Sequence, residues 1–403
     1  DVCSSDLKKI IEGLGFRFHH VRAINSLLAV NTPFVLWSQS GMENSLFAFL
    51  LASGCFLILT FYKEQNTAVV IWIAVVSFLI SITRPEGLFF AVAFPLSLFI
   101  FPVKDKNRQL INYCFALFIP VTAFLLFRYS YFHDWLPNTY YVKGKVNFGF
   151  YHLVEKFRYL SYSIGGRWAI FLILFSLVMW VPVVRFYLKK NKSAIIPAAF
   201  FLISFFHFML MPDDWMGELR FAIPLILFGY IYLLLIIFYL QSQFPSLTTK
   251  TIVFAFVLFF GYCGYHFTKR SVQFSKEPTV PLTRVKEMFA DRFNNYSEKL
   301  QLKHASIFLP DLGGALLYSN IKVYDASGLC DRTLAKTIAT DPKATHNYIF
   351  DTLKPTFIHL HDVWAAKITT KLFRNKNFCE SCVIASHFLK DTSSPHWLSA
   401  CWK

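Results

Sequence analysis

Apolar residues gather in nine blocks along the first two thirds of the chain. The blocks run at about 22–37, 45–62, 68–83, 88–102, 110–127, 168–184, 194–211, 221–240 and 251–267. Each is roughly 15–20 residues long, near the length that a helix needs to cross about 30 Å of hydrocarbon. Because the apolar positions are continuous and do not alternate, they favour helices over a β-barrel. The pattern predicts an α-helical polytopic membrane protein with about nine transmembrane helices.

The pattern changes after about residue 270. Short β-like runs at 305–309, 321–324, 356–360 and 383–385 alternate with helical segments. This order is typical of a small α/β domain with a partly parallel sheet. We therefore expect three parts: a cytoplasmic or junction segment at 1–21, a transmembrane helical domain at 22–267, and a water-soluble α/β domain at 268–403.

Composition agrees with a membrane protein and bears on nucleic-acid binding. Hydrophobic residues make up 55% of the chain and charged residues 16%, whereas soluble domains carry about 25% charged residues. The net charge is +16, but the lysines and arginines lie in short clusters between apolar blocks, as the positive-inside rule expects. No basic stripe is interleaved with aromatic residues outside the blocks, so we expect no nucleic-acid partner.

The loops sort into two sets by charge. Those at 103–109, 185–192 and 241–250 are short and mostly basic, which is typical of cytoplasmic loops. Strict alternation then places the other loops on the opposite face, together with the chain after residue 267. These outer loops lie at 40–44, 84–87, 128–166 and 212–220, and they hold most acidic residues near the membrane.

The segment 212–220 (PDDWMGELR) is the strongest candidate for chemistry. Charges between two apolar blocks are costly unless they are functional or exposed to water. Asp213 and Asp214 are suited to deprotonating an acceptor hydroxyl or holding a divalent cation, and Arg220 to gripping a phosphate. The alternative is a solvated loop that only separates two helices.

Two shorter outer segments carry further charges. In 84–87 (RPEG), Pro and Gly interrupt the helices while Arg84 and Glu86 are placed to pair. A site and a structural hairpin are equally compatible with this segment. In 40–44 (SGMEN), Glu43 stands at a helix start, where capping of the helix dipole is the simpler interpretation.

The outer segment 133–143 (HDWLPNTYYVK) mixes aromatic and polar residues. Aromatic faces such as those of Trp135 and Tyr140 stack on sugar rings, while Asp134, Asn138 and Lys143 offer polar contacts. An aromatic belt at the membrane interface would have the same composition.

In the C-terminal part, Asp311 and Asp325 each follow a predicted strand. Ligands often bind at the carboxyl ends of such strands, although Asp311 is also placed to cap a helix. Four cysteines, Cys330, Cys379, Cys382 and Cys401, allow disulfides, free thiols or a zinc site with a histidine. His207, inside an apolar block, is interpreted as a packed, hydrogen-bonded histidine.

Five motifs resemble, in order, those of one family. SGMEN, TRPEG, DWLPNTYYVK, PDDWMGELRFAIP and DLGGALLYSNIKVYDASGLCDR are similar to segments of bacterial multi-spanning glycosyltransferases of the GT-C type. The terminal arabinofuranosyltransferase-like group is the most similar, over about residues 23–362. These enzymes place a catalytic aspartate in the first outer loop. This sequence has no counterpart, so either it is an N-terminally truncated fragment, which we expect, or the chain is inactive.

The resemblance implies sugar transfer from a polyprenyl-phosphate donor to an envelope glycan or lipid, on the extracytoplasmic face of the bacterial inner membrane. Asp213 and Asp214 would be catalytic, and Arg220, Arg84 and Lys143 would bind the donor phosphate. The remaining candidates for substrate binding are Glu43, Glu86, Asp134, Trp135, Asn138, Tyr140, Asp311 and Asp325. No cofactor is expected beyond a divalent metal, whose ligands the sequence leaves open. A lipid-linked-sugar transporter and a non-enzymatic envelope protein are the alternatives.

Overall fold

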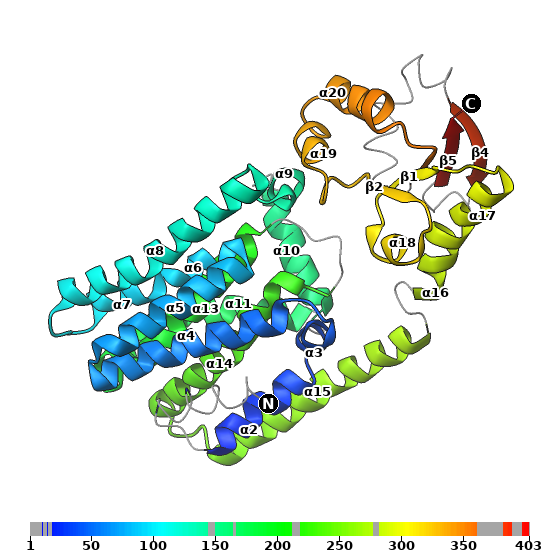
Figure 1. Ribbon diagram of the computed structural model, residues 1–403. Coiled ribbons are helices and arrows are strands. Elements are labelled where there is room, and N and C mark those ends of the chain that lie inside the picture. Colours follow the sequence, from blue (N-terminus) through cyan, green and yellow to red (C-terminus); the bar gives the residue numbers. More distant parts are fainter. Residues whose placement is uncertain are drawn as a thin grey trace. The chain divides into compact units, whose positions relative to one another are not determined.

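A computed structural model describes residues 10, 14, 18–143, 150–163, 167–211, 218–276, 282–360, 382–388 and 397–402. The chain divides into two compact units (Figure 1). The first, Asp1–His133 with Val146–Ser275, is here called the helical unit; the second, Asp134–Lys145 with Lys276–Lys403, is called the sheet unit. The segment Asp134–Lys145 thus belongs with the C-terminal residues, whereas the sequence analysis assigned it to the transmembrane domain.

The described part of the helical unit is built from helices, with short 3-10 turns between some of them (Figure 1). In chain order these are α2 (Phe18–Ala29), α3 (Thr32–Gln39), α4 (Asn44–Glu64), α5 (Thr67–Thr83), η1 (Pro85–Gly87), α6 (Leu88–Ala91), α7 (Ala93–Ile100), α8 (Lys106–Phe132), α10 (Phe150–Ser163), α11 (Arg167–Val178), α12 (Trp180–Lys190), η2 (Lys192–Ala194), α13 (Ile195–Leu210), η3 (Arg220–Ala222), α14 (Ile223–Gln243) and α15 (Thr249–Lys276).

Five helical segments in the described residues are long and apolar enough to cross a membrane. They are Asn44–Glu64, Lys106–Phe132, Lys192–Leu210, Arg220–Gln243 and Thr249–Lys276. The pair α11 and α12, bent by 48°, makes a sixth if it is one span. The chain is therefore a helical membrane protein, and five or six helices of its described residues reach spanning length, so nine spans are not confirmed.

Local sequence explains the shorter segments. The block at 22–37 is broken into α2 and α3 because Asn31 caps α3, accepting a hydrogen bond from Phe34 N at 3.0 Å, with Pro33 in the first turn. The block at 88–102 is divided at Val92 between α6 and α7. Pro85–Ile100 and Thr67–Thr83 are apolar but shorter than a full span.

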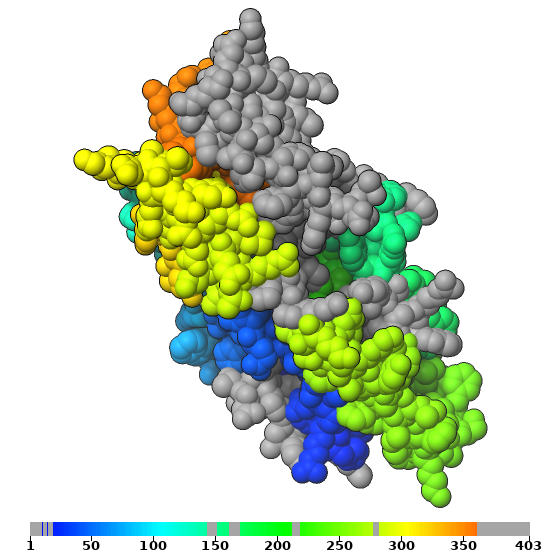
Figure 2. All heavy atoms as spheres, turned by 90° about the vertical axis from the view of Figure 1, so that its right-hand side faces the viewer, coloured from blue at the N-terminus to red at the C-terminus, as the bar shows by residue number. Residues whose placement is uncertain are grey.

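The core of the helical unit lies around α4, α13 and α14, where large aromatic side chains such as Phe47, Phe201 and Phe228 are fully buried. By contrast, only 11% of the most apolar stretch of α8 and 6% of that of α15 are buried. Figure 2 shows α15 at the surface with α2 beside it. Such exposed apolar faces are expected where a helix meets lipid.

The sheet unit contains a five-stranded sheet and short helices. In chain order the elements are α9 (Asn138–Lys143), α16 (Leu282–Val285), η4 (Lys286–Asp291), α17 (Arg292–Lys299), β1 (Ser306–Leu309), α18 (Leu312–Tyr318), β2 (Lys322–Asp325), α19 (Arg332–Thr337), α20 (Pro342–Asn347), η5 (Tyr348–Leu353), β3 (Phe357–Leu360), β4 (Cys382–Phe388) and β5 (Trp397–Trp402). The strand order is β2-β1-β3-β5-β4.

The first three strands are parallel, since β1 pairs in parallel with both β2 and β3. β5 pairs antiparallel with β3 and with β4. Each of the four β-like runs in the sequence overlaps a strand, and β5 was not predicted. The all-buried strands β1 and β3 form the middle of the unit, with Phe308 and Phe357 almost inaccessible.

Candidate functional site

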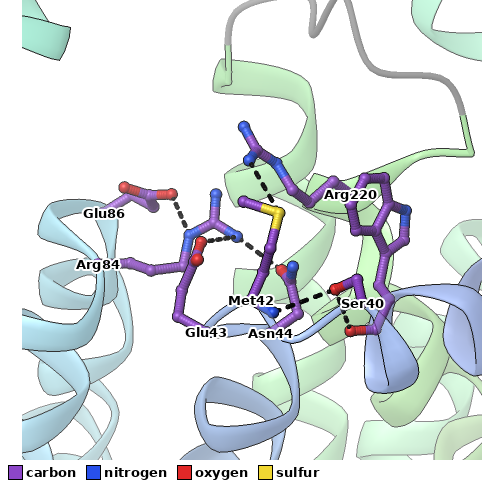
Figure 3. Close-up of polar contacts among 8 residues, drawn as sticks. Ser40, Met42, Glu43, Asn44, Arg84, Glu86 and Arg220 are labelled. Atoms are coloured by element: carbon purple, nitrogen blue, oxygen red, sulfur yellow. Dashed lines mark hydrogen bonds and ion pairs between the residues drawn. The ribbon is translucent and has the colours of Figure 1, made fainter. Parts of the chain in front are cut away.

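Arg84 is the centre of a charged cluster at the point where α5 ends. The residue has an extended backbone (φ −147°), and Pro85 then begins the η1 turn. Its Nε donates to Glu86 Oε1 at 2.7 Å and its Nη1 to Asn44 Oδ1 at 2.9 Å (Figure 3). The pairing of Arg84 with Glu86, expected from the sequence, is confirmed.

A close backbone approach holds this turn in place. A Cβ on Gly87 would lie 2.4 Å from the carbonyl oxygen of Ile80. The same oxygen accepts the backbone N–H of Arg84 at 3.1 Å. Only glycine fits so tightly against backbone, so Gly87 fixes the turn that directly follows Arg84.

Glu43 faces the same guanidinium. It is the N-cap residue of α4, but its side chain makes no capping hydrogen bond. Capping of the helix dipole is therefore not its whole role, because Glu43 Oε1 also lies 3.5 Å from Arg84 Nη1, with the Glu43 side chain 34% exposed. The loops at 40–44 and 84–87 thus form one site.

Arg220, from the 212–220 segment, joins this site. It begins η3 after two residues with positive φ, Glu218 and Leu219, and it is buried. Its Nη1 lies 3.9 Å from Met42 Sδ, and Figure 3 shows Met42 beside the guanidinium groups of both arginines. The ring of Phe221 is shared, with Arg84 Cζ at 4.6 Å and Arg220 Cζ at 5.1 Å from its centroid. Two cations from distant parts of the sequence therefore meet over one aromatic ring.

Glu218 anchors the segment that carries Arg220. Its carbonyl oxygen accepts from Trp37 Nε1 at 2.7 Å, and its carboxylate pairs with Arg270 of α15. Burial raises the pKa of Glu218, and the nearby Arg270 offsets part of that effect. The pair fixes the loop against α3 and α15.

Two buried basic side chains, Lys156 and His207, extend the site into the bundle. The sequence analysis did not predict that they lie near each other. Lys156 of α10 is buried, with its Nζ 5.2 Å from the centroid of Phe208. His207 of α13 lies within electrostatic reach of both Arg84 and Lys156. It is packed as expected, but neither ring nitrogen has a hydrogen-bond partner in the described chain, so the expected hydrogen bond was wrong. No sequence motif distinguishes Lys156 from other lysines.

Some predicted site residues fall outside what the structure describes. Asp213 and Asp214 lie outside the described residues, as does the side chain of Lys143. Within the described ranges, no three His, Cys, Asp or Glu residues form a group that could hold a metal ion. Cys330 is a free thiol, whereas the side chains of Cys379, Cys382 and Cys401 lie outside the described part.

Asp134 belongs to a separate cluster in the sheet unit. Its carboxylate accepts from Tyr141 Oη at 2.7 Å and pairs with Lys336 and, at 3.4 Å, with Arg332 of α19. The hydrogen bond from Lys336, with that from Tyr141, holds the pKa of Asp134 well below its usual range. Asn138 Nδ2 donates to the carbonyl of Leu329 at 3.3 Å. Two of the three predicted polar contacts, Asp134 and Asn138, are thus engaged within the protein.

The other candidates in the sheet unit differ in how accessible they are. Trp135 and Tyr140 are about half exposed, as stacking on a sugar requires. Asp325 is buried and accepts from Ser327 N at 2.7 Å and Cys330 N at 2.5 Å, so it holds the loop after β2. Asp311 is the N-cap residue of α18 without a side-chain capping hydrogen bond, contrary to the capping interpretation.

The cluster around Arg84 and Arg220 can bind an anion, because guanidinium groups match phosphate oxygens in charge and geometry. Nη2 of Arg84 makes no hydrogen bond with the described residues. No protein-family model and no curated protein matches this chain.

Proposed function

We propose that the chain is a membrane glycosyltransferase that uses a polyprenyl-phosphate sugar as donor. The phosphate would bind Arg84 and Arg220, and the sugar would pass to a hydroxyl of an envelope glycan or lipid. Asp213 or Asp214 would deprotonate that hydroxyl. The observation that carries the proposal is the meeting of two buried arginines over Phe221 at one end of the helical unit.

The arrangement of charge supports an anionic ligand. Buried Arg84 is offset by Glu86 at 2.7 Å, but Glu43 is farther, at 3.5 Å, and partly exposed. A phosphate could therefore replace Glu43 at Nη1 and also use Nη2 without breaking the shorter pair. Away from bulk water such charged hydrogen bonds are strong.

The membrane setting supports a lipid-linked ligand. The arginine cluster lies where apolar helices α4, α5 and α14 begin or end, and charges at such positions often mark substrate sites. The exposed apolar faces of α8 and α15 would contact lipid, including the polyprenyl chain.

The proposal includes a topology that follows from the loop charges. The short apolar helices α5 and Pro85–Ile100, and the pair α2 and α3, would enter the membrane with the longer helices to complete nine segments. The chain would lie in a bacterial inner membrane. The arginine cluster and a C-terminal α/β domain would then both be extracytoplasmic, where acidic loops are expected.

The test is transfer from a labelled polyprenyl-phosphate pentose or hexose by the full-length protein in lipid nanodiscs. Arg84→Gln and Arg220→Gln should each lower the rate roughly 100-fold, as expected for lost transition-state charge stabilisation. Asp213→Asn and Asp214→Asn distinguish the base, since one should have the larger effect. Arg220→Lys keeps the charge but loses the two-pronged guanidinium, so its transfer rate should lie between those of the wild type and Arg220→Gln.

Arg185→Gln is the matched control, because Arg185 is an exposed arginine on α12, outside the cluster. Its rate should equal that of the wild type. Wild-type rates in both Arg84→Gln and Arg220→Gln would remove the site assignment. Labelled donor that crosses the bilayer of reconstituted vesicles without being consumed would contradict sugar transfer itself.

A further inference from the structure

The sheet unit contains a cavity that is separate from the features discussed above. Its volume is about 530 Å³, and it lies at the amino ends of β1 and β2. Asp311 and Asp325 are at the opposite, carboxyl, ends of the same strands. The cavity is therefore not the edge of the sheet from which a ligand site was expected.

Basic side chains from three segments converge on this cavity. Lys303 and His304 precede β1, Lys322 begins β2, and Lys354 follows η5. β1 and β2 are parallel with Ser306 opposite Lys322, so their amino ends share one edge of the sheet. Lys354 has a left-handed backbone (φ 46°), and its N–H donates to Ile349 O at 2.9 Å. The fold thus brings the three lysines to one place.

The converging charges are not neutralised within the described chain. None of the three lysines forms an ion pair with a described residue, and Glu298 is the single acidic residue in the lining. Lys322 has a cation–π contact, with its Nζ 4.8 Å from the centroid of Tyr324. Like charges gathered in a concave site repel one another, and a bound anion relieves that repulsion.

The walls of the cavity are held by partly buried hydrogen bonds. Asn294 donates to Tyr318 O at 3.1 Å and accepts from Asn320 N at 2.8 Å. Ser306 and Thr356 exchange hydrogen bonds, with N-to-Oγ distances of 3.1 and 3.2 Å. A site whose walls are already ordered loses little entropy when a ligand binds.

We propose that this cavity binds a small phosphorylated sugar, with the lysines holding the phosphate and the polar wall facing the hydroxyl groups. The volume is within the range of small-molecule sites, about 300–1,000 Å³. A concave pocket fits such a ligand better than it fits a flat lipid surface. The proposal does not depend on the glycosyltransferase assignment, because it concerns residues of the sheet unit alone.

The test is calorimetric titration of the full-length protein in phosphatidylcholine nanodiscs. The probes are a hexose 1-phosphate, inorganic phosphate and the free hexose. The hexose phosphate should bind at least roughly ten times more tightly than the free hexose, and its affinity should fall with added salt because the contacts are ionic. Inorganic phosphate should lie between the two if the hydroxyl contacts contribute.

The double variant Lys322→Gln and Lys354→Gln should weaken hexose phosphate binding at least roughly tenfold, since each lost charge contributes. Glutamine tolerates the left-handed backbone at 354 no worse than lysine does. Lys343→Gln is the matched control, because Lys343 is exposed on α20 and does not line the cavity. Far-ultraviolet circular dichroism verifies that the variants fold.

Three results would overturn the proposal. They are equal binding of the free hexose, equal binding of hexose phosphate by the double variant, and no binding of any probe at millimolar concentration. Lysine-dependent adsorption to anionic vesicles without hexose phosphate binding would indicate a membrane contact instead.

Discussion

The protein buries charge in two clusters of opposite sign. In the helical unit the buried residue is a cation, Arg84, and its carboxylate partners Glu86 and Glu43 are 14% and 34% exposed. In the sheet unit the buried residue is an anion, Asp134, and its partners Lys336 and Arg332 are 38% and 52% exposed. Each cluster joins segments that are far apart in sequence.

The two clusters differ in what remains free for a ligand. Both oxygens of Asp134 are engaged, Oδ1 by Tyr141 and Oδ2 by two cations. By contrast, Nη2 of Arg84 makes no hydrogen bond with the described residues, and Arg220 packs on the same Phe221 ring as Arg84. The Asp134 cluster is therefore a structural tether, whereas the Arg84 cluster is a site that can accept an anion. Burial of a charge alone does not separate the two cases.

The largest effect should come from Gly87→Ala, which tests how rigidly Arg84 is held. The added Cβ would meet the carbonyl oxygen of Ile80, and backbone cannot move aside as a side chain can. We expect destabilisation of about 1–3 kcal/mol, typical of overpacking, with weaker donor binding because Arg84 moves. Thermal unfolding in detergent measures the first effect and donor titration the second.

Gly229→Ala is its control, since no described atom beyond the neighbouring turns of α14 lies within 4 Å of the new Cβ. That variant should be as stable as the wild type or slightly more so, because alanine favours helix. If Gly87→Ala melts at the wild-type temperature, the close contact does not fix the turn, and Arg84 is less preorganised than we infer.

The sequence predicted the positions of the helices better than their lengths. Every apolar block contains a helix, because apolar residues in a block carry the signal for a buried or lipid-facing segment. The break at Asn31 depends on one cap and one proline, which a hydropathy pattern averages out. β5 (WLSACW) was missed because its pairing with β3 and β4 is set by tertiary contacts.

The candidate site was predicted in part. The sequence indicated that Arg84 would pair with Glu86 and that the 40–44 loop would lie on the same side of the membrane as Arg84. In the structure Arg84 contacts both Glu86 and Asn44 of that loop. It could not indicate that Asp134 is engaged by Lys336, since such a partner is chosen by the fold and not by spacing. The burial of Lys156 was likewise beyond it, because burial of a basic residue depends on which helices pack together; the packing of His207 was predicted, but not its place beside Arg84 and Lys156.

A smaller effect should follow from Asp134→Asn, which breaks the tether in the sheet unit. Asparagine still accepts from Tyr141 but leaves Lys336 and Arg332 without their counter-charge. These cations are partly exposed, so we expect a loss of about 1 kcal/mol. Amide hydrogen exchange in α19 should become faster, because that helix carries both cations.

Asp351→Asn is the matched control, because Asp351 is exposed on η5 and forms no ion pair with the described residues. Exchange in α19 should be unchanged there. Equal exchange in Asp134→Asn and the wild type would show that the ion pairs do not hold the segment 134–145 to α19.

The smallest effect should be seen in how the melting temperatures of the wild type and Asp134→Asn depend on pH. The hydrogen bond from Lys336 places the folded pKa of Asp134 below the unfolded value, which is about 3.9. A depressed carboxyl pKa stabilises the fold above the unfolded pKa, and this contribution is lost as the pH falls through the folded pKa. The difference in melting temperature between wild type and Asp134→Asn should therefore be constant from pH 7 to about 4 and shrink below it.

Glu218, whose pKa is raised by burial, has the opposite sign: its contribution to stability is present below the unfolded pKa and is lost as the pH rises through the folded pKa. A Glu218→Gln variant should accordingly gain on the wild type as the pH rises, and a parallel pH response of the two variants would contradict the contrast between the clusters.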